Sequence, residues 1–345
     1  MSKINIAIDA MGGDNGAQIV VPASINALKK HPNLHLILVG DQAVLQPYVD
    51  HLDPELAGRL TCRHASQVVE MDESPSQSLR YKKDSSMRVA INLVKAGEAQ
   101  ACVSAGNTGA LMATAHFVLK TLSGVDRPAI LGVLPTQNPS KCVHILDLGA
   151  NVDSSPKALF QFAVMGSVLA RAVDGIENPK VALLNIGVED IKGNELVKQT
   201  AQLLSGSQQI NYVGYVEGDE IFKGRADVIV CDGFVGNVAL KTIEGEAKFI
   251  TKIIKEAFRK NFWTRLVALF ALFALRTIKK RLNPDLYNGA SFLGLRGIVI
   301  KSHGRTTVKG FEQAIENALQ EVDHNVPELI EETVAELLKA GAENK

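Results

Sequence analysis

The chain has 345 residues, of which 46% are hydrophobic and 21% are charged, and its formal net charge is zero. These proportions exclude a mostly disordered chain and can form a large core. We therefore expect one α/β catalytic unit over residues 1–345, and we expect no nucleic-acid partner.

The four cysteines lie far apart and form no CxxC pair, so the sequence indicates neither a zinc site nor a disulfide framework. The N-terminus continues directly into strand-like sequence and lacks the pattern of a signal peptide. Together these features favour a reducing cytoplasm.

Short, continuous apolar runs predict strands that are covered on both faces. They alternate with segments of helical spacing, which favours a mostly parallel sheet with helices on both faces. The runs begin at Ile4, Leu34, Ala101, Ala129, Cys142, Val181, Ala226 and Gly297, and the helical segments are Ala17 to Lys30, Ser86 to Lys95, Ala158 to Val173 and Asn194 to Leu204.

The longest polar segment extends from Asp72 to Ser86. A solvated loop is the default interpretation of one polar stretch. Its Ser, Arg and Lys residues before a helix start also fit a substrate-binding loop.

Polar turns follow six of the predicted strands. Because ligands of open parallel sheets bind outside the carboxyl ends of the strands, we expect these turns to converge on one crevice. Each turn alone is also consistent with an ordinary structural turn. The candidate residues in them are Asp9, Asp14, Ser104, Asn151, Asp153, Lys192, Asn194, Asp232, Asn237 and His303.

The turn SAGNTGA is the best candidate for a phosphate site. Gly106 and Gly109 let the backbone approach a ligand, and the amides of Asn107 and Thr108 precede a helix, whose N-terminus carries free N–H donors and partial positive charge. The hydroxyls of Ser104 and Thr108 add donors. The alternative is a tight turn followed by a Thr-capped helix.

Several catalytic signatures are absent from the sequence. It contains no GxxxxGK[ST], GxGxxG, GxSxG or HExxH motif, which argues against a P-loop ATPase, a Rossmann dinucleotide fold, a serine hydrolase and a zinc protease. A phosphate site without an evident protein nucleophile suggests that phosphate itself attacks.

In order, the turns closely resemble those of the phosphate acyltransferases of bacterial phospholipid synthesis, the PlsX family. The matching stretches extend over nearly the whole chain and are DAMGGD from Asp9, SAGNTGA from Ser104, LDLGANVD from Leu146, NIGVEDIKGNE from Asn185, DGFVGN from Asp232 and KSHG from Lys301. One local departure is Ala290 after Gly289, where a glycine pair is expected.

The resemblance implies transfer of a long-chain acyl group from acyl carrier protein to inorganic phosphate. The acyl phosphate would then feed a membrane glycerol-3-phosphate acyltransferase. The resemblance also implies a homodimer with a fold akin to phosphotransacetylase and the isocitrate dehydrogenase group, and it implies no metal and no nicotinamide cofactor.

For the mechanism, Lys192 and Asn194 are candidates for orienting phosphate or stabilising the oxyanion, and His303 is a candidate proton donor. Asp9, Asp14 and Asp232 could orient cationic or backbone groups or protonate the leaving sulfur. For any one aspartate, capping a turn is at least as probable as catalysis.

Residues 248–289 predict a basic, apolar helical insert. Its part from 248 to 281 carries ten Lys or Arg and one acidic residue, and its stretch Leu266 to Leu275 covers only about 15 Å, too short for a bilayer. A buried or dimer-interface hairpin and an anchor on an anionic membrane are both open, and the basic rim would also attract the acidic carrier protein. The candidate contact residues are Arg259, Lys260, Trp263, Arg265, Leu269, Phe270, Phe273 and Arg276.

Three other functions compete with long-chain acyl transfer. A short-chain phosphotransacetylase using coenzyme A would share the phosphate site but has no need of the apolar insert. A metal- and nicotinamide-dependent dehydrogenase of similar fold should show a metal-binding Asp cluster and an adenosine loop. A non-enzymatic protein tethered to membranes would leave six polar strand ends unexplained.

Overall fold

A computed structural model describes residues 3–281 and 283–343. Within these residues, one sheet contains 11 strands in the order β3-β2-β1-β4-β11-β10-β5-β6-β9-β7-β8. The strands are β1 (Ile4–Asp9), β2 (Leu34–Gly40), β3 (Leu60–His64), β4 (Ala101–Ser104), β5 (Ala129–Pro135), β6 (Cys142–Leu146), β7 (Lys180–Leu184), β8 (Asn211–Val216), β9 (Val228–Val230), β10 (Ala290–Leu293) and β11 (Ile298–Lys301).

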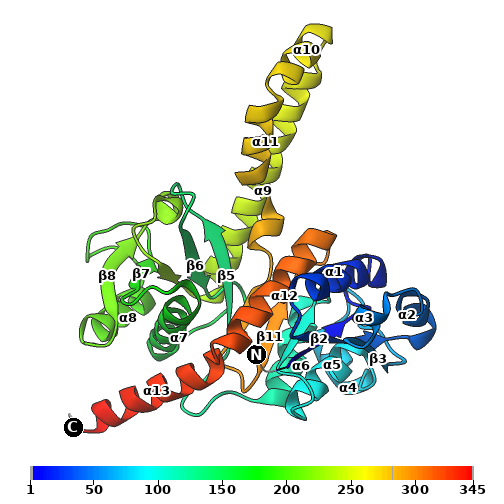
Figure 1. Cartoon of the computed structure of the whole chain (residues 1–345). Helices are drawn as coiled ribbons and strands as arrows, with labels where there is room; N and C mark the ends of the chain where they lie inside the picture. Colours follow the sequence, from blue (N-terminus) through cyan, green and yellow to red (C-terminus); the bar gives the residue numbers. More distant parts are fainter. Residues whose placement is uncertain (1–2, 282, 344–345) are drawn as a thin grey trace.

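Helices cover both faces of the sheet, as the sequence predicts (Figure 1). The helices are α1 (Ala17–Lys30), α2 (Gln42–Val49), α3 (Pro54–Ala57), α4 (Pro75–Tyr81), α5 (Ser86–Lys95), α6 (Thr108–Leu119), α7 (Pro156–Asp174), α8 (Glu195–Ser205), α9 (Gly233–Arg259), α10 (Phe262–Phe270), α11 (Leu272–Arg281), α12 (Val308–Asp323) and α13 (Val326–Glu343), with short 3-10 segments η1 (Gly218–Lys223) and η2 (Pro284–Tyr287).

Three apolar clusters form the core. On one face, α5, α6 and the first part of α9 pack on strands of the whole sheet. On the other face, α1 and α12 cover β1, β2, β4 and β11, while α7, α8 and α13 cover β5, β6, β7 and β9. The continuous apolar runs in the sequence are explained by this burial on both faces.

The sheet has two halves that run in opposite directions. Strands β3, β2, β1, β4 and β11 are mutually parallel, and so are β6, β9, β7 and β8. Between the halves, β10 and β5 make three successive antiparallel pairings, β11 with β10, β10 with β5 and β5 with β6. The sheet is mostly parallel as predicted, but the six polar turns form two groups of three rather than one group.

The second part of helix α9, together with α10 and α11, forms an arm that projects from the body of the molecule (Figure 1). Helix α9 has 27 residues, which corresponds to about 40 Å. Apolar side chains on the arm face solvent, with Phe270 83% and Phe273 85% exposed. The arm is therefore not part of the core of this chain. Of the predicted alternatives, the buried hairpin does not apply, and the dimer interface and the membrane contact remain.

The predicted insert of residues 248–289 begins within α9 and ends just before β10. Its last residue, Gly289, has φ +105, which favours glycine, and Ala290 begins β10 in extended backbone, where glycine is not required. The departure at Ala290 therefore disturbs nothing locally. At the other end, helix α9 already begins at Gly233 and emerges from the body along its length. Within the described residues, no helix is long and apolar enough to cross a membrane.

Two glycines of α9 offer a matched stability test. A Cβ on Gly236 would lie 1.9 Å from the backbone oxygen of Asp147, whereas one on Gly245 would meet nothing within 4 Å. We expect Gly236→Ala to lower the free energy of unfolding by about 1–3 kcal/mol or more. Gly245→Ala should raise it by about 0.5–1 kcal/mol through helix propensity. Urea unfolding measures both, and equal effects at the two positions would contradict this account.

Candidate active site

The first cluster comprises the turns after β1, β4 and β11, which are residues 9–16, 104–109 and 302–307. Three adjacent strands place Asp9, Ser104 and Lys301 side by side, because Ser104 is the register partner of both other residues. The Asp9 carboxylate is 1% exposed and accepts hydrogen bonds from the hydroxyls of Ser104 and Ser86, each at 2.6 Å. Burial raises the pKa of the Asp9 carboxyl, and these hydrogen bonds oppose the shift.

Through these contacts, Asp9 and Ser104 stabilise the turns of the first cluster. The Ser104 hydroxyl also accepts the N–H of Gly106 at 3.0 Å, so it ties the phosphate-candidate turn to the sheet. A Cβ on Gly12 would lie 2.5 Å from an Asp9 oxygen, which explains the glycine there. Asp9 and Ser104 therefore shape the turns from below, and the side chain of neither faces solvent.

Lys301 is a buried cation that the sequence analysis did not single out. Its ammonium donates to the backbone oxygens of Ala105 (3.2 Å) and Ser302. Burial lowers the pKa of Lys301 to about 8, the negative charges of Asp9 and Asp14 oppose this shift, and Lys241 adds to it. An ammonium beneath the turn of residues 104–109 provides positive charge at the candidate phosphate site.

His303 lies at the open side of the first cluster. Its Nδ1 accepts the backbone N–H of Arg305 at 3.1 Å, so the neutral ring carries its proton on Nε2. The pKa of His303 is lowered, first by partial burial and also by Lys301, Lys241 and Lys248, while Glu244 opposes the shift. A neutral imidazole with a free Nε2–H can donate a hydrogen bond, and its imidazolium form can donate a proton.

Asn288 holds the His303 turn in place. Its amide donates to the Ser302 and Thr306 hydroxyls at 2.7 and 2.9 Å and to the Gly310 oxygen, and its oxygen accepts the N–H of His303 at 3.0 Å. Asp14, a predicted substrate contact, is exposed and pairs with Arg305 at 3.1 Å. The first and third turns are therefore linked directly.

Helix α6 begins in the second turn of this cluster. Asn107 caps the helix by accepting the N–H of Ala110 at 3.0 Å, and its amide donates to the oxygens of Met71 and Glu73. The Asn107 side chain thus bonds within the protein, and its backbone N–H remains as a candidate phosphate donor. For the backbone N–H groups of residues 107–109, no acceptor is present among the described residues, so they and the exposed Thr108 hydroxyl can receive an anion.

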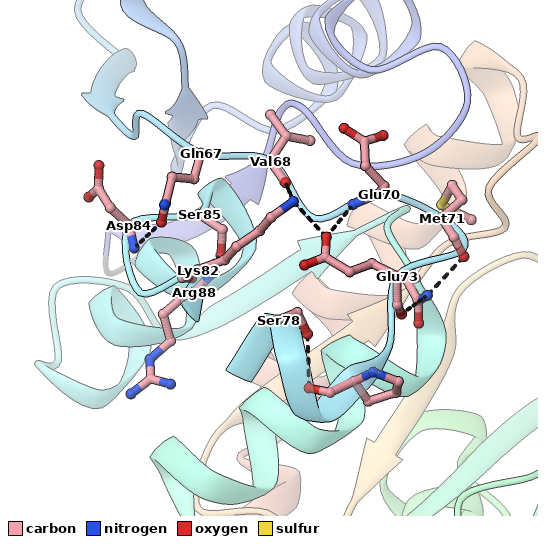
Figure 2. A network of polar contacts seen from close by, with 12 residues as sticks. Gln67, Val68, Glu70, Met71, Glu73, Ser78, Lys82, Asp84, Ser85 and Arg88 are labelled. Atoms are coloured by element: carbon pink, nitrogen blue, oxygen red, sulfur yellow. Dashed lines mark hydrogen bonds and ion pairs between the residues drawn. The ribbon is translucent and has the colours of Figure 1, made fainter. Parts of the chain in front are cut away.

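The polar segment of residues 66–85 packs beside this turn (Figure 2). Lys82 bonds the Val68 oxygen and the Glu73 carboxylate, each at 2.6 Å, and Asp84 donates its N–H to Gln67. The segment, which includes α4 and most of the predicted polar stretch from Asp72 to Ser86, is therefore internally bonded and meets Asn107.

The second cluster comprises the turns after β6, β9 and β7, which are residues 147–153, 232–237 and 185–194. Buried Asp147 organises it by accepting four backbone N–H groups, from Ile130, Gly149, Ala150 and Asn151, and the Asn151 amide. Asn151 is buried and its amide also bonds the Pro128 oxygen, so it is a scaffold residue rather than a free ligand contact.

The other predicted residues of the second cluster divide into caps and exposed groups. Asp232 accepts the N–H groups of Phe234 and Val235 and caps α9, and Asn194 caps α8. These contacts match the structural alternative for Asp232. Asn237, Asp153 and Lys192 are exposed, and Asn237 lies against Gly149, whose Cβ would be 3.4 Å from the Asn237 Cβ.

Exposed apolar side chains surround the second cluster and form what we call the apolar rim. Ile186 is 79% exposed and Ile191 is 80% exposed, on the same turn as Lys192. Exposed apolar residues this close together mark a binding or subunit surface. The rim consists of Val152, Ile186, Val188, Ile191, Phe234, Val235 and Val238.

The two clusters lie on opposite sides of the sheet, because the strands of its two halves end in opposite directions. Helix α9 connects them. The helix begins at Gly233 in the second cluster, and its residues Lys241 and Lys248 influence the pKa of His303 in the first. At 1.5 Å per residue, about 12 Å of helix separates Gly233 from Lys241 and about 22 Å separates it from Lys248. Within one chain, the structure does not bring Lys192 and Asn194 together with Ser104 and His303.

Sequence patterns could have indicated part of what was missed. Lys301 ends an apolar run next to Ser302 and His303, and a lysine in a strand that is otherwise apolar is a signal of a buried cation. Ser86 and Asn288 give no such signal, since they are 77 and 14 residues from the side chains they bond.

The fold and the first cluster define an α/β protein with a candidate anion site, and the chain has close relatives among enzymes. A family model described as fatty acid synthesis protein matches residues 4–329. Curated phosphate acyltransferases from Coxiella burnetii (strain RSA 331 / Henzerling II) and Legionella pneumophila (strain Paris) are 57% and 55% identical, over 97% and 99% of both chains. The chain belongs to this family, and its enzymatic class is phosphate acyltransferase.

Solved structures support the fold assignment. A phosphotransacetylase from Streptococcus pyogenes aligns with a TM-score of 0.62 at 16% identity, covering 93% of this chain and 94% of the other. A branched-chain phosphotransacylase from Enterococcus faecalis V583 aligns with a TM-score of 0.56 at 15% identity, covering 92% and 99%. The predicted phosphotransacetylase-like fold is confirmed.

Lys301 makes stability depend on pH in a defined direction. Its pKa is about 8 in the folded protein against a usual 10.5, so between these values the unfolded chain binds more protons and the free energy of unfolding rises with pH. We expect the wild type to gain up to about 3 kcal/mol relative to Lys301→Met between pH 7.5 and 10.5. Denaturant unfolding across this range measures the difference, and a constant difference would contradict the buried cation.

Proposed function

We propose that this phosphate acyltransferase moves a long-chain acyl group from acyl-acyl carrier protein to inorganic phosphate. A phosphate oxygen attacks the thioester carbon, the C–S bond breaks, and the departing thiolate takes a proton, which leaves an acyl phosphate and the carrier thiol. The observation that carries this proposal is the combination of a cationic site beside a helix N-terminus with an unusual extent of exposed apolar surface on the arm and the apolar rim.

Phosphate binds at the start of α6. Backbone N–H groups of residues 107–109 and the Thr108 hydroxyl donate to it, and the helix N-terminus favours a dianion. Lys301 contributes charge from below the turn, and Lys241 and Lys248 contribute charge from α9. No step in this reaction requires a metal or nicotinamide.

His303 supplies the proton that the leaving sulfur takes, acting as an imidazolium that becomes a neutral ring. Burial and the lysines around it lower the pKa of His303, which makes the imidazolium a stronger acid. Proton donation by a positioned imidazole is typically worth about 10²–10⁴ in rate. This role rests on the open position of His303 beside the phosphate turn.

Lys192 and Asn237 reach the reaction from a second copy of the chain. They lie on the opposite side of the sheet from the phosphate turn. The exposed apolar rim around them is typical of a surface that another protein buries. Charges also match, because the exposed Asp153, Glu189 and Asp190 of the second cluster complement the lysines of α9. A homodimer that joins the second cluster of one protomer to the first cluster of the other assembles the full site.

The arm serves the acyl donor and the membrane. Its basic residues, including Arg259, Lys260 and Arg265, attract an acidic carrier protein and an anionic bilayer, and its apolar side chains accept acyl chains. This arrangement fits a cytoplasmic enzyme that associates peripherally with the membrane and passes its product to a membrane glycerol-3-phosphate acyltransferase.

Comparing acyl carrier protein with coenzyme A as the thioester carrier tests the donor. Equal kcat/KM for a two-carbon coenzyme A thioester would favour a short-chain phosphotransacetylase instead.

The phosphate site is tested by Thr108→Val, which keeps the shape of the residue but removes a donor. We expect the KM for phosphate to rise about tenfold or more, since a hydrogen bond to a charged group contributes about 1.5–3 kcal/mol. Steady-state assays with varied phosphate measure the change. Thr333→Val, on α13, is the control, and an unaltered phosphate KM in folded Thr108→Val would refute the site.

The shared site is tested by Lys192→Met and His303→Ala. Lys192→Met should lower kcat by about 10²–10³, the usual effect of one lost donor to developing charge. If the site is shared, co-expressing the two variants should restore about a quarter of wild-type activity, because half of the dimers are mixed and each holds one intact site. Purified mixed dimers without recovered activity would place both residues in one protomer or show Lys192 to be structural.

The membrane contact is tested by replacing Leu269, Phe270 and Phe273 together with Ser. We expect weaker binding to anionic vesicles in flotation assays, and in the unmodified protein raised salt should weaken binding because about 1 kcal/mol per basic residue is screened. Replacing exposed Phe117, Leu203 and Leu338 is the control. If the arm variant instead becomes monomeric and still binds vesicles, the arm is a subunit interface.

A further inference from the structure

A group of three metal-ligand side chains lies away from both clusters. Donor atoms of Cys142, His144 and Asp174 are all within 4.8 Å of one another. Cys142 and His144 are two residues apart on β6 and so project from the same face of the sheet. Asp174 is the last residue of α7, which packs on that face, so the fold joins a remote carboxylate to the pair.

The three residues differ in burial in a way that suits an ion. His144 is 3% exposed, and its Nε2 bonds the Asp174 carboxylate. Its Nδ1 is buried and has no hydrogen-bond partner among the described residues. The thiol of Cys142 is free and only partly buried, and the Asp174 side chain is 25% exposed. An ion can therefore approach from the Asp174 side, while the imidazole is held in the interior.

We propose that Cys142, His144 and Asp174 bind one Zn²⁺ ion, with water as the fourth ligand. One sulfur, one nitrogen and one oxygen donor match the borderline character of zinc, whereas magnesium and calcium prefer oxygen alone. In a tetrahedral site with ligand bonds of about 2.0–2.3 Å, donor atoms lie roughly 3.3–3.7 Å apart. The three donor atoms lie within 4.8 Å of one another, so small side-chain shifts bring them to this spacing. Binding replaces the hydrogen bond between His144 and Asp174 with two bonds to the ion.

This site is distinct from the acyl-transfer machinery. Cys142 begins β6, whereas the turn that contributes to the second cluster follows the other end of the strand at Leu146. The ion would join the end of α7 to β6 and stabilise the second half of the sheet. A role in stability rather than turnover follows from this placement.

Cobalt and zinc titrations of chelator-treated protein test the site. We expect one Co²⁺ per chain to give a thiolate-to-cobalt charge-transfer band, which Zn²⁺ removes, and we expect Zn²⁺ to raise Tm. Cys142→Ser should abolish the band and the rise in Tm. Cys62→Ser, which removes another partly buried thiol, should leave both unchanged.

Two results would overturn the proposal. One is the absence of a saturable cobalt band in the folded wild type, and the other is an equal band in Cys142→Ser. If Cys142→Ser does not fold, Asp174→Asn replaces it, since an amide oxygen still accepts from His144. That variant should bind Co²⁺ about tenfold or more weakly, and unchanged affinity would count against the site.

Discussion

The arrangement of both polar clusters depends on three successive antiparallel pairings at the centre of the sheet. Two of them, β11 with β10 and β5 with β6, follow from short connections, because residues 294–297 join β10 to β11 and residues 136–141 join β5 to β6. A parallel pair needs a crossover of a dozen or more residues, so these links permit only antiparallel neighbours. Each antiparallel pairing reverses the direction of the next strand. After three reversals, the carboxyl ends of the second half point away from those of the first half. This constraint decides on which side of the sheet each polar turn lies.

Helix α9 is the element that relates the two halves again. It starts at the capping Asp232, passes over the face shared by α5 and α6, and continues into the arm. Its first two turns are fixed by Gly233 and Gly236, which lie against the Asp147 turn, and its middle carries the lysines that act on His303. One continuous helix thus links the second cluster, the lysines that act on His303 and the apolar arm. A displacement of the arm would therefore move helical residues at both clusters.

Much of the fold could be predicted from the sequence because burial on both faces leaves a local signal. The apolar runs at Ile4, Leu34 and Ala129 became strands with the expected bounds. The direction of the strands could not be derived from those runs, since hydrophobicity does not distinguish a parallel from an antiparallel neighbour; only the short links could have indicated it. The positions of the turns could be predicted, but the residues that bond to them could not. Ser86 bonds Asp9, and Asp174 bonds His144, across sequence separations that only tertiary packing brings together.

The buried polar residues explain why the reactive groups are mostly backbone and surface groups. Asp9, Ser104 and Asn107 are conspicuous in the sequence, yet their hydrogen-bonding capacity is largely used within the protein, as a buried polar group requires. What they hold in place is a turn whose N–H groups point to solvent above a buried ammonium. In the proposed mechanism, a phosphate nucleophile needs no activation by a protein base, only position and neutralised charge, and the fixed amides and the buried ammonium supply these without reorganising. In that mechanism, the conspicuous polar side chains therefore act on the reaction through the backbone that they fix.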